Sequence, residues 1–355
     1  MKKILIVKMS SMGDVIHTMP ALTDARGAYP DIQFDWVVEP GFEQIPSWHP
    51  AVNQVIAAPL RRFRKMPWQS FKDGEWNRFI KQLRKNRYDL VIDAQGLLKS
   101  AIVASIAKGK RVGLDYRSAR EKCASFFYQQ QVTVPWQQHA VERVRQLFAR
   151  ALGYSLPKTP PQYGIDASRL PAVSHGTNTV LFLHGTTWTT KHWPQPFWEQ
   201  LAHIVADKGF QVLLPWGNEV EKARALAIKQ YCEKHLTTMV PIVLPKHSLA
   251  ELTTLLSQAK GVVAVDTGLG HMAAAMAVPT VSLYGPTSAA LTGAYGPWQQ
   301  HLNSTLACSP CLGRECKQGN AFTITPPCFE SIAPRTVWQN LQKLMKEYQT
   351  SHVNS

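Results

Sequence analysis

An aspartate closes the first loop of the chain, where it can act as a base. The loop MSSMGD, residues 9–14, follows the apolar run Ile4–Val7 and precedes a helical pattern, so Asp14 lies just past an expected strand. A carboxylate there can take a proton from a bound hydroxyl group. Aspartate is also a common helix N-cap, and a helix N-terminus lowers its pKa below the range that suits a general base. Spacing alone leaves both roles open.

The second half holds a loop suited to binding a phosphate. In GTTWTTKHWP, residues 185–194, the hydroxyls of Thr186 and Thr187 lie close in sequence to Lys191. A lysine in this position can neutralise the charge that grows on a departing diphosphate. A threonine-rich turn with a solvated lysine is the alternative.

The strongest local signal is VDTGLGH, residues 265–271, which follows an apolar strand pattern and opens a helix. Asp266 and Thr267 supply acceptors and backbone amides. Gly268 permits close approach of the backbone, and the helix dipole favours an anion. His271 can donate to a phosphate or a hydroxyl group, although a lone histidine is more often structural.

Two further turns add polar groups beside expected strand ends. Glu221, in WGNEVE, can accept hydrogen bonds from ribose hydroxyls, or it can be a carboxylate that only stabilises the first turn of a helix. YGPTS, residues 284–288, is a second turn suited to a phosphate.

The chain is strongly basic. Its 39 Lys and Arg against 24 Asp and Glu give a formal net charge of +15, which favours an anionic partner. The cluster RRFRK, residues 61–65, contributes, with Arg120 downstream. Arginine clusters bind phosphates and carboxylates, although many are merely solvated. Aromatic residues do not alternate with these cations as in proteins that bind single-stranded nucleic acid, so an acidic glycolipid headgroup fits as well as a nucleic acid does.

Four cysteines form the one set of residues that resembles a metal site. They are Cys308, Cys311, Cys316 and Cys328, and the first two are separated by two residues, as in zinc knuckles. A structural metal, reduced thiols and an incidental disulfide all remain open. No other group of His, Asp or Glu indicates a catalytic metal.

Several classes of protein are disfavoured. The first loop lacks G-x-G-x-x-G, and no G-x-x-x-x-G-K-[ST] occurs, which counts against dinucleotide enzymes and P-loop ATPases. The apolar run near the N-terminus is too short for a signal peptide, and no run approaches the roughly 18 residues that span a bilayer. We therefore expect a cytoplasmic protein that meets a membrane only at its surface.

Expected strands and helices alternate along the whole chain, the pattern of parallel α/β proteins. Strands are expected at 3–7, 34–38, 90–92, 112–114, 179–183, 212–215, 240–244, 262–265 and 280–283. Helices are expected at 15–28 (shortened by Pro20), 77–85, 97–108, 140–152, 197–208, 219–232, 249–258, 271–277 and 335–347.

This alternation predicts two Rossmann-like domains, each with an open parallel sheet, facing a central cleft. The expected boundaries are 1–155 for an N-terminal acceptor-binding domain, 156–178 for a linker and 179–333 for a donor-binding domain. Residues 334–355 form a closing helix and tail that can pack back on the N-terminal domain.

The motifs together resemble the lipopolysaccharide heptosyltransferases of glycosyltransferase family 9, which are inverting enzymes of the GT-B fold, and the chain looks most like heptosyltransferase I. The segments that carry the resemblance cover nearly the whole chain: ILIVKMSSMGDVIHTMPAL, FDWVVE, IPSWHPAV, RRFRK, YDLVIDAQGLLKSA, QQHAVERVRQLFA, LHGTTWTTKHWP, LPWG, VDTGLGHMAAA and YGPT.

The resemblance implies a role for each candidate residue. Asp14 matches the family's proposed general base. Residues implied to bind the donor are Thr186, Thr187, Lys191, Glu221, His247 (on the adenine side, through its backbone), Asp266, Thr267, Gly268 and His271. Residues implied to meet the anionic acceptor are Arg61, Arg62, Arg64, Lys65 and Arg120.

The resemblance also implies the reaction. L-glycero-D-manno-heptose passes from ADP-heptose to Kdo of a Kdo-lipid A acceptor by a single in-line displacement with inversion. Asp14 takes the proton from a Kdo hydroxyl, Lys191 stabilises the leaving ADP, and no metal or other cofactor is required. The partners are then the donor, the acceptor and the cytoplasmic face of the inner membrane of a Gram-negative bacterium, and no nucleic acid.

Other readings remain open. The acceptor can instead be phosphorylated Kdo or a first heptose. A sugar-nucleotide epimerase of the GT-B fold shares the architecture and needs no lipid acceptor. A basic module that binds RNA or a membrane, without catalysis, is favoured by the charge alone.

Overall fold

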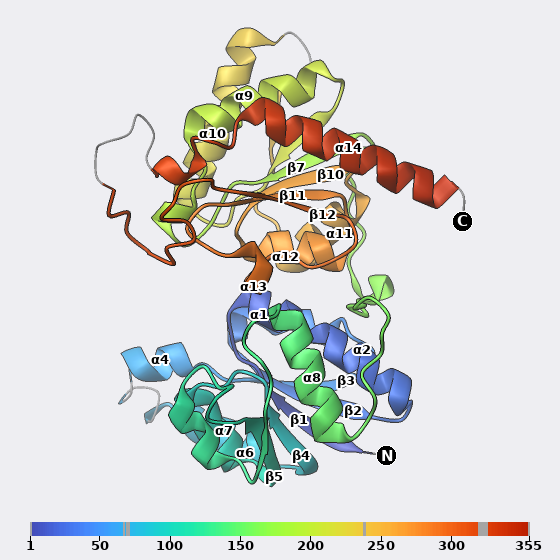
Figure 1. Cartoon of the computed structure of the whole chain (residues 1–355), viewed down its shortest axis with the longest axis vertical. Helices are drawn as coiled ribbons and strands as arrows, with labels where there is room; N and C mark the ends of the chain where they lie inside the picture. The colour runs from blue at the N-terminus through green and yellow to red at the C-terminus, as the bar shows by residue number, and fades with distance from the viewer. Residues whose placement is uncertain (1, 67, 69–71, 237–238, 319–325, 354–355) are drawn as a thin grey trace. The chain divides into compact units, whose positions relative to one another are not determined.

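The chain divides into two compact units, residues 1–169 and 170–355 (Figure 1). The computed structural model describes residues 2–66, 68, 72–236, 239–318 and 326–353. Both units alternate strands and helices, as the sequence pattern predicts.

The first unit is built on a six-stranded sheet in the order β3-β2-β1-β4-β5-β6, and each strand is parallel to its neighbours. Its strands are β1 (Lys3–Val7), β2 (Gln33–Val38), β3 (Val52–Ala57), β4 (Arg87–Asp93), β5 (Lys108–Leu114) and β6 (Gln130–Val132). Its described α-helices are α1 (Met12–Ile16), α2 (Met19–Ala28), α3 (Gln44–Ser47), α4 (Leu60–Lys65), α6 (Glu75–Leu83), α7 (Leu98–Ile106) and α8 (Ala140–Leu152).

The second unit repeats this plan with the order β12-β11-β10-β7-β8-β9, again all parallel. Its strands are β7 (Thr179–Leu183), β8 (Gln211–Leu214), β9 (Ile242–Val243), β10 (Gly261–Val265), β11 (Thr280–Tyr284) and β12 (Gln299–Asn303). Its described α-helices are α9 (Gln195–Asp207), α10 (Glu219–His235), α11 (Leu249–Gln258), α12 (Gly268–Ala275), α13 (Ala289–Thr292) and α14 (Pro334–Val353).

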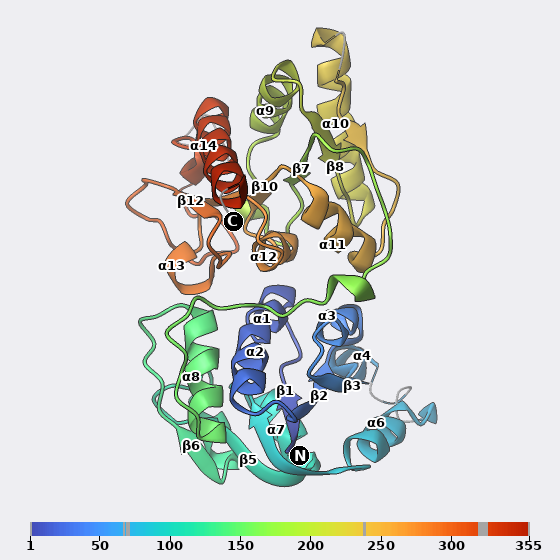
Figure 2. The same cartoon turned by 90° about the vertical axis from the view of Figure 1, so that its right-hand side faces the viewer.

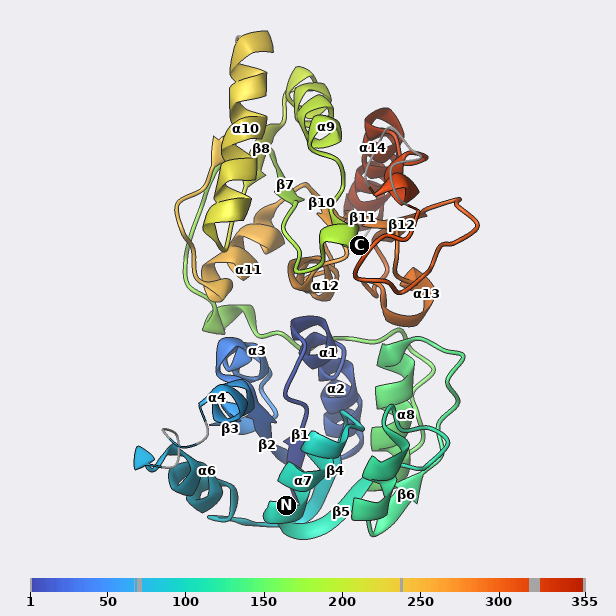
Figure 3. The same ribbon diagram turned by 90° about the vertical axis from the view of Figure 1, so that its left-hand side faces the viewer.

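Helices cover both faces of each sheet (Figures 2 and 3). In the first unit, Leu5 and Val7 of β1 share a buried core with Phe79 of α6 and Val103 of α7. The opposite face is closed by α2 and α8, which pack on each other. In the second unit, α9, α10 and α14 close one face through a single hydrophobic core. Buried on both sides, the central strands are nearly all apolar, as parallel strands require.

The two sheets share the same strand order, and in both this order reverses once. In each, the chain runs outward from the first strand in one direction and then crosses over to continue in the other. The strand order therefore reverses between β1 and β4 in the first unit, and between β7 and β10 in the second. In open parallel sheets, ligands bind beside the carboxyl ends of the strands at such a point.

Several elements differ from expectation. The expected helix 15–28 is two helices, because the first ends at Ile16 and the second begins at Met19 with Pro20 in its first turn. The helix expected at 271–277 begins at Gly268. Three strands were not expected, β3, β6 and β12; each lies at a sheet edge, where half-exposed positions carry polar residues and weaken the apolar signal.

The segment expected as a linker, 156–178, is divided between the two units and bonded to each. The backbone N–H of Asp166 donates to Trp48 O at 3.0 Å in the first unit, and Thr254 Oγ1 donates to Pro171 O at 2.8 Å in the second. The closing helix α14 packs on α9 and on strands β10 to β12 and belongs to the second unit. Among the described helices, none combines the length and the apolar character needed to cross a membrane.

Candidate active site

Every candidate catalytic or donor-binding residue follows the carboxyl end of a strand. Asp14 follows β1, Lys191 follows β7, and Asp266 follows β10, so all three lie at the points where strand order reverses. Glu221 and His247 follow the neighbouring strands β8 and β9. The topology therefore gathers the second-unit candidates at one edge of their sheet.

Asp14 lies in the first turn of α1, three residues after the N-cap Ser11. Its Oδ2 accepts hydrogen bonds from Ser11 N at 2.7 Å and from Ser11 Oγ at 2.8 Å. The alternative role of N-cap is thus wrong in detail: Ser11 is the cap residue, and Asp14 supplies the reciprocal carboxylate of a capping box. The Asp14 side chain remains 36% exposed.

The charge of Asp14 is set by its neighbours. Burial acts to raise the pKa of its carboxyl group, but the Lys8 ammonium, the two bonds from Ser11 and the charge of Arg120 outweigh it, and the pKa lies below its usual value. Lys8 Nζ is 3.6 Å from Asp14 Oδ1. Asp14 is therefore ionised at neutral pH.

The predicted acceptor-binding cations occupy two places in the first unit. Arg120 lies near enough to Asp14 to lower its pKa, so the structure brings these two residues together. The other four lie on α4. Arg62 forms ion pairs with Glu75 at 3.0 Å and with Asp73 at 3.8 Å, and Lys65 is exposed. The side chains of Arg61 and Arg64 lie outside the described part of the structure.

Asp266 is the centre of a polar cluster in the second unit. Its Oδ2 lies 2.7 Å from Lys191 Nζ and accepts a hydrogen bond from Thr287 Oγ1, also at 2.7 Å. His271 Nε2 is 3.8 Å from Oδ1, and Thr186 Oγ1 donates to the backbone oxygen of Asp266 at 3.0 Å. The Lys191 and Asp266 side chains are only 15% and 11% exposed, so this pair is largely withdrawn from water.

The remaining donor candidates border this cluster along the chain. Thr267 is the N-cap of α12 and Gly268 its first residue, so the first free N–H groups of the helix follow Asp266 directly. Thr187 is exposed on the loop that carries Lys191. Amides, hydroxyls and one lysine at a helix start form a cradle suited to a diphosphate.

Lys191 is held by its surroundings. It ends the short 3₁₀ helix η4 (Thr189–Lys191), where buried Thr190 Oγ1 donates to Gly313 O at 2.9 Å. The Lys191 ammonium also lies over the Trp188 ring, 4.4 Å from its centroid. Trp193, two residues after Lys191, is buried and donates to Ile332 O at 3.1 Å, so it is a packing residue.

Glu221 fills the corner between the loops after β7 and β8. Its Oε2 accepts from Gly217 N at 2.7 Å, and its backbone N–H donates to the Asn218 side chain at 3.0 Å. A Cβ at Gly185 would lie 2.5 Å from the Glu221 carboxyl carbon, so a larger residue there would push this carboxylate out of its place. Glu221 is therefore both a first-turn carboxylate and part of the candidate donor edge.

The described side-chain contacts of His247 are with α11, which begins two residues later, and with His175. Its Nδ1 is 3.5 Å from Glu251 Oε2, and its ring meets His175 edge-on at 5.8 Å between centroids. A contact with an adenine through its backbone stays a prediction.

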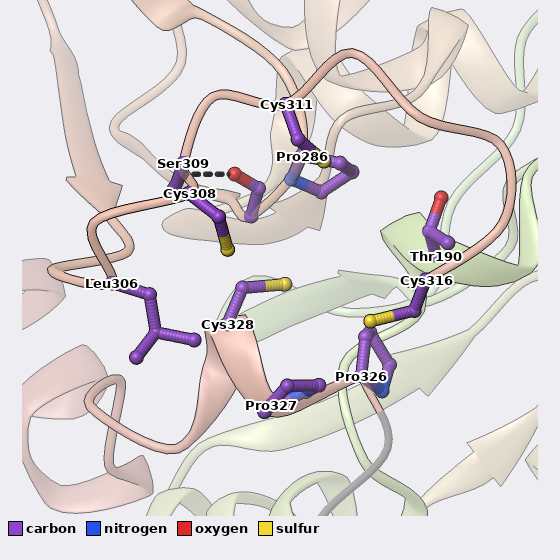
Figure 4. A pocket seen from close by; sticks show the side chains of 11 residues that line it. Thr190, Pro286, Leu306, Cys308, Ser309, Cys311, Cys316, Pro326, Pro327 and Cys328 are labelled. Carbon is purple, nitrogen blue, oxygen red and sulfur yellow. Dashed lines mark hydrogen bonds between the residues drawn. The ribbon is translucent and has the colours of Figure 1, made fainter. Parts of the chain in front are cut away.

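The four cysteines line one small pocket of the second unit (Figure 4). All four are free thiols; Cys328 is buried and the other three are exposed. Burial and the neighbouring cysteines raise the pKa of Cys328 to about 12. Across the described ranges, however, no three His, Cys, Asp or Glu side chains are arranged to hold a metal ion. The structure thus brings the four cysteines to one pocket but does not arrange them as a tetrathiolate metal site. A structural metal bound by these cysteines stays a prediction.

Comparisons with known proteins agree with this geometry. The model of glycosyltransferase family 9 (heptosyltransferase) matches residues 76–322. Lipopolysaccharide heptosyltransferase 1 of Pseudomonas aeruginosa is 49% identical over 353 residues, which cover 97% of this chain and 98% of that protein. The same-named protein of Escherichia coli K12 is 47% identical over 299 residues, which cover 83% and 91%.

Two solved structures are similar throughout. E. coli heptosyltransferase WaaC with ADP has a TM-score of 0.83 and 43% identity, covering 96% of this chain and 99% of that one. WaaC with ADP-2-deoxy-2-fluoro heptose has a TM-score of 0.81 and 42% identity, covering 96% and 99%. With the two parallel six-stranded sheets, this likeness confirms the predicted α/β fold class of the GT-B type.

Proposed function

The chain belongs to glycosyltransferase family 9, the heptosyltransferases, and from this premise we propose that it transfers L-glycero-D-manno-heptose from ADP-heptose to Kdo of a Kdo-lipid A acceptor. Glycosyl transfer of the heptosyltransferase 1 type, with ADP-heptose as donor, follows from the near full-length similarity to proteins of that name and to WaaC with ADP and a fluorinated ADP-heptose. The sugar accepted and its lipid carrier are the finer part of the proposal.

One observation carries the mechanism. The loops where strand order reverses provide a negative charge in the first unit and mainly positive charge and N–H donors in the second. After β1, Asp14 presents a half-exposed carboxylate kept ionised by cations. After β7 and β10, Lys191 and the start of α12 offer positive charge and N–H groups around Asp266. The first fits a base that takes a proton from an acceptor hydroxyl, and the second fits an anion that leaves.

The chemistry is a single displacement. The acceptor oxygen forms a bond to the anomeric carbon of heptose while its proton passes to Asp14. The bond from that carbon to the diphosphate breaks, and its electron pair leaves with ADP, whose charge Lys191 meets. A base of low pKa suffices because the hydroxyl becomes strongly acidic as its oxygen bonds to carbon. We expect activity to persist in excess EDTA, because cationic side chains of the protein stabilise the charge of the leaving ADP.

The deciding experiment supplies ADP-heptose with and without Kdo-lipid A. The proposal expects ADP release that depends on the acceptor, with the acceptor gaining the mass of one heptose. A changed sugar nucleotide in the absence of acceptor would instead support an epimerase, and no change in either tube would contradict both enzymes. Parallel reactions with phosphorylated Kdo-lipid A and with an acceptor already carrying a heptose test the alternative acceptors.

We also propose that the protein works at the cytoplasmic face of the inner membrane, because its acceptor is a lipid and its net charge is +15. Anionic surfaces attract such a protein through its basic residues. Sedimentation with vesicles of anionic lipid, but not with neutral ones, is the expected result. Equal binding to both would contradict a charge-based contact.

A further inference from the structure

A lysine stands buried beside the proposed base. Lys8 directly follows β1, and its side chain is only 9% exposed. Its Nζ donates to Ala94 O at 3.0 Å and lies 3.6 Å from Asp14 Oδ1. Lysine is seldom buried without a charged partner, and this one has Asp14.

The lysine is held in place from several sides. Its backbone oxygen accepts from Trp36 Nε1 at 3.0 Å. Gln95, at the end of β4, accepts from Met9 N at 2.8 Å and donates to Ser10 O at 3.1 Å. The loop after β1 is thus fastened to the loop after β4 directly beyond the lysine, which holds the ammonium beside Asp14.

The two oxygens of Asp14 have different surroundings. Oδ2 accepts two short bonds from Ser11. Oδ1 has the Lys8 ammonium nearby, at a distance too long for a hydrogen bond. In the described part of the chain, Oδ1 is therefore the oxygen with a lone pair free to receive a proton.

We propose that Lys8 is a positioning residue for the transfer reaction: the two bonds from Ser11 occupy Oδ2 of Asp14 and leave Oδ1 to take the acceptor's proton, while the fixed charge of Lys8 beside Oδ1 holds the carboxylate in place and keeps it ionised. This inference rests on the proposed role of Asp14 as the base. In the step, the proton moves from the acceptor hydroxyl to Oδ1, the hydroxyl oxygen bonds to the anomeric carbon, and the electron pair of the broken bond leaves with ADP. Lys8 keeps its own protons throughout. Its charge then favours release of the new proton from Asp14 to water.

A structural role for Lys8 is the competing explanation, because the bond to Ala94 O joins two loops on its own. The two explanations differ in how activity depends on pH. Two cations face Asp14, Lys8 and Arg120. Removal of the Lys8 charge leaves the charge of Arg120 and raises the pKa of Asp14, whereas loss of a structural bond lowers activity equally at every pH.

The test compares Lys8→Met, Lys8→Gln and Lys8→Arg with the wild-type enzyme and with Lys3→Met. Lys3 is the matched control: it begins β1, the strand that Lys8 directly follows, and its ammonium faces a different carboxylate, Asp35 Oδ2, at 3.7 Å. The measurements are kcat/KM for the acceptor from about pH 3 to 9, ADP affinity by calorimetry, and thermal unfolding at each pH, which shows where in that range the protein remains folded.

In Lys8→Met and Lys8→Gln, we expect the acidic limb of the profile to move up by about 1–2 pH units. Activity at low pH then falls roughly ten-fold or more and recovers as pH rises, with ADP affinity within about two-fold of wild type. Lys8→Arg restores the position of the limb, and Lys3→Met does not move it. Because Gln and Arg retain donors for Ala94 O, they keep the test valid if Lys8→Met does not fold.

A limb that stays at the wild-type position in both neutral variants overturns the inference, whatever their stability. Asp14→Asn separates this failure from failure of the proposed function. If Asp14→Asn is inactive while the limb is unmoved, only the role of Lys8 is wrong. If Asp14→Asn keeps near-normal turnover, the base assignment is wrong and the inference about Lys8 is wrong with it.

Discussion

Asp14 follows the first strand of the first unit, and Asp266 follows the fourth strand of the second unit. The two carboxylates have different surroundings. Asp14 is 36% exposed, and two bonds from one serine hold a single oxygen of its carboxylate. Asp266 is 11% exposed, and its carboxylate meets Lys191, Thr287 and His271 at once. The same type of residue, beside the point where strand order reverses in each sheet, thus accepts its hydrogen bonds from a serine of its own loop in the first unit and directly meets a lysine and a threonine of other loops in the second.

This difference separates their chemistry. A carboxylate surrounded by donors orients those donors, and here it fixes the Lys191 ammonium at the start of α12. A more exposed carboxylate that is ionised at neutral pH can take a proton from a bound hydroxyl group. The comparison therefore assigns proton transfer to the first unit and binding of the diphosphate to the second. A substitution in each unit tests each assignment separately.

The largest effect is expected from Asp14→Asn. The amide keeps the shape of the side chain but cannot take a proton, so kcat should fall about 10²- to 10⁴-fold while ADP affinity stays within about two-fold. Steady-state kinetics and calorimetry measure the two quantities. Asp31→Asn, an exposed carboxylate of the same unit, is the control and should behave as wild type. Loss of ADP affinity in Asp14→Asn would erase the proposed contrast between the units.

Lys191→Ala should produce the opposite pattern. It removes positive charge from the diphosphate cradle and leaves Asp266 buried without its cation, so ADP binding should weaken by about 100-fold. Lys229→Ala is the matched control, because Lys229 pairs with Glu233 on the exposed side of α10, 3.6 Å away, and its loss should leave ADP affinity unchanged. Isothermal calorimetry decides the matter, and normal ADP affinity in Lys191→Ala would show that the cradle does not bind the donor.

Much of this contrast could be predicted from the sequence, because both loops follow strongly apolar strands and open helices. Asp14, Lys191 and Asp266 stand at those strand ends, and parallel topology brings strand ends together. The edge strands β3, β6 and β12 could not be found in the same way, since their polar residues give little periodic signal.

The side chains that contact the two aspartates could not all be predicted from the sequence either. Lys8 stands at the end of an apolar run, where nothing local marks it as a neighbour of Asp14, and its hydrogen-bond acceptor Ala94 lies 86 residues further along. Thr287 reaches Asp266 across 21 residues, although the turn that carries it was singled out as suited to a phosphate. Such pairings depend on strand order, which local patterns do not specify.

The two units should also respond alike to acid, because each contains a buried histidine whose pKa is lowered. Burial and nearby cations lower the pKa of His49 in the first unit to about 4 and that of His184 in the second to about 3. Below the unfolded value of about 6.5, the unfolded chain binds a proton at each position and the native chain does not, so stability falls as pH falls towards 4. At pH 5 each histidine should cost about 2 kcal/mol of unfolding free energy relative to pH 7.5.

Urea unfolding at pH 5 and pH 7.5, with the wild type, His49→Gln and His184→Gln, checks this expectation. Each substitution should reduce the loss of stability between the two pH values in the unit that carries it. Ala51 N donates to Nδ1 of His49 at 3.1 Å, which a protonated ring cannot accept, so the first unit offers the clearer case. An unchanged pH dependence in both variants would mean that other groups govern the acid response.

The smallest effect is expected from Thr287→Val, because Thr287 only supports the carboxylate of Asp266 in the second unit. The substitution keeps the volume of the side chain and removes the hydroxyl that donates to Asp266 Oδ2 at 2.7 Å. Loss of one such bond costs about 1 kcal/mol, or roughly five-fold in ADP affinity, with little change in kcat. Thr292→Val, on α13 nearby, removes a long 3.4 Å bond to Ser288 O and should change nothing. If Thr287 acts only by orienting Asp266, Thr287→Val should add no further loss in an Asp266→Asn background. Additive losses in the double variant would instead mean that Thr287 contacts the donor itself, and the second unit's carboxylate would then organise less of its site than the comparison with Asp14 implies.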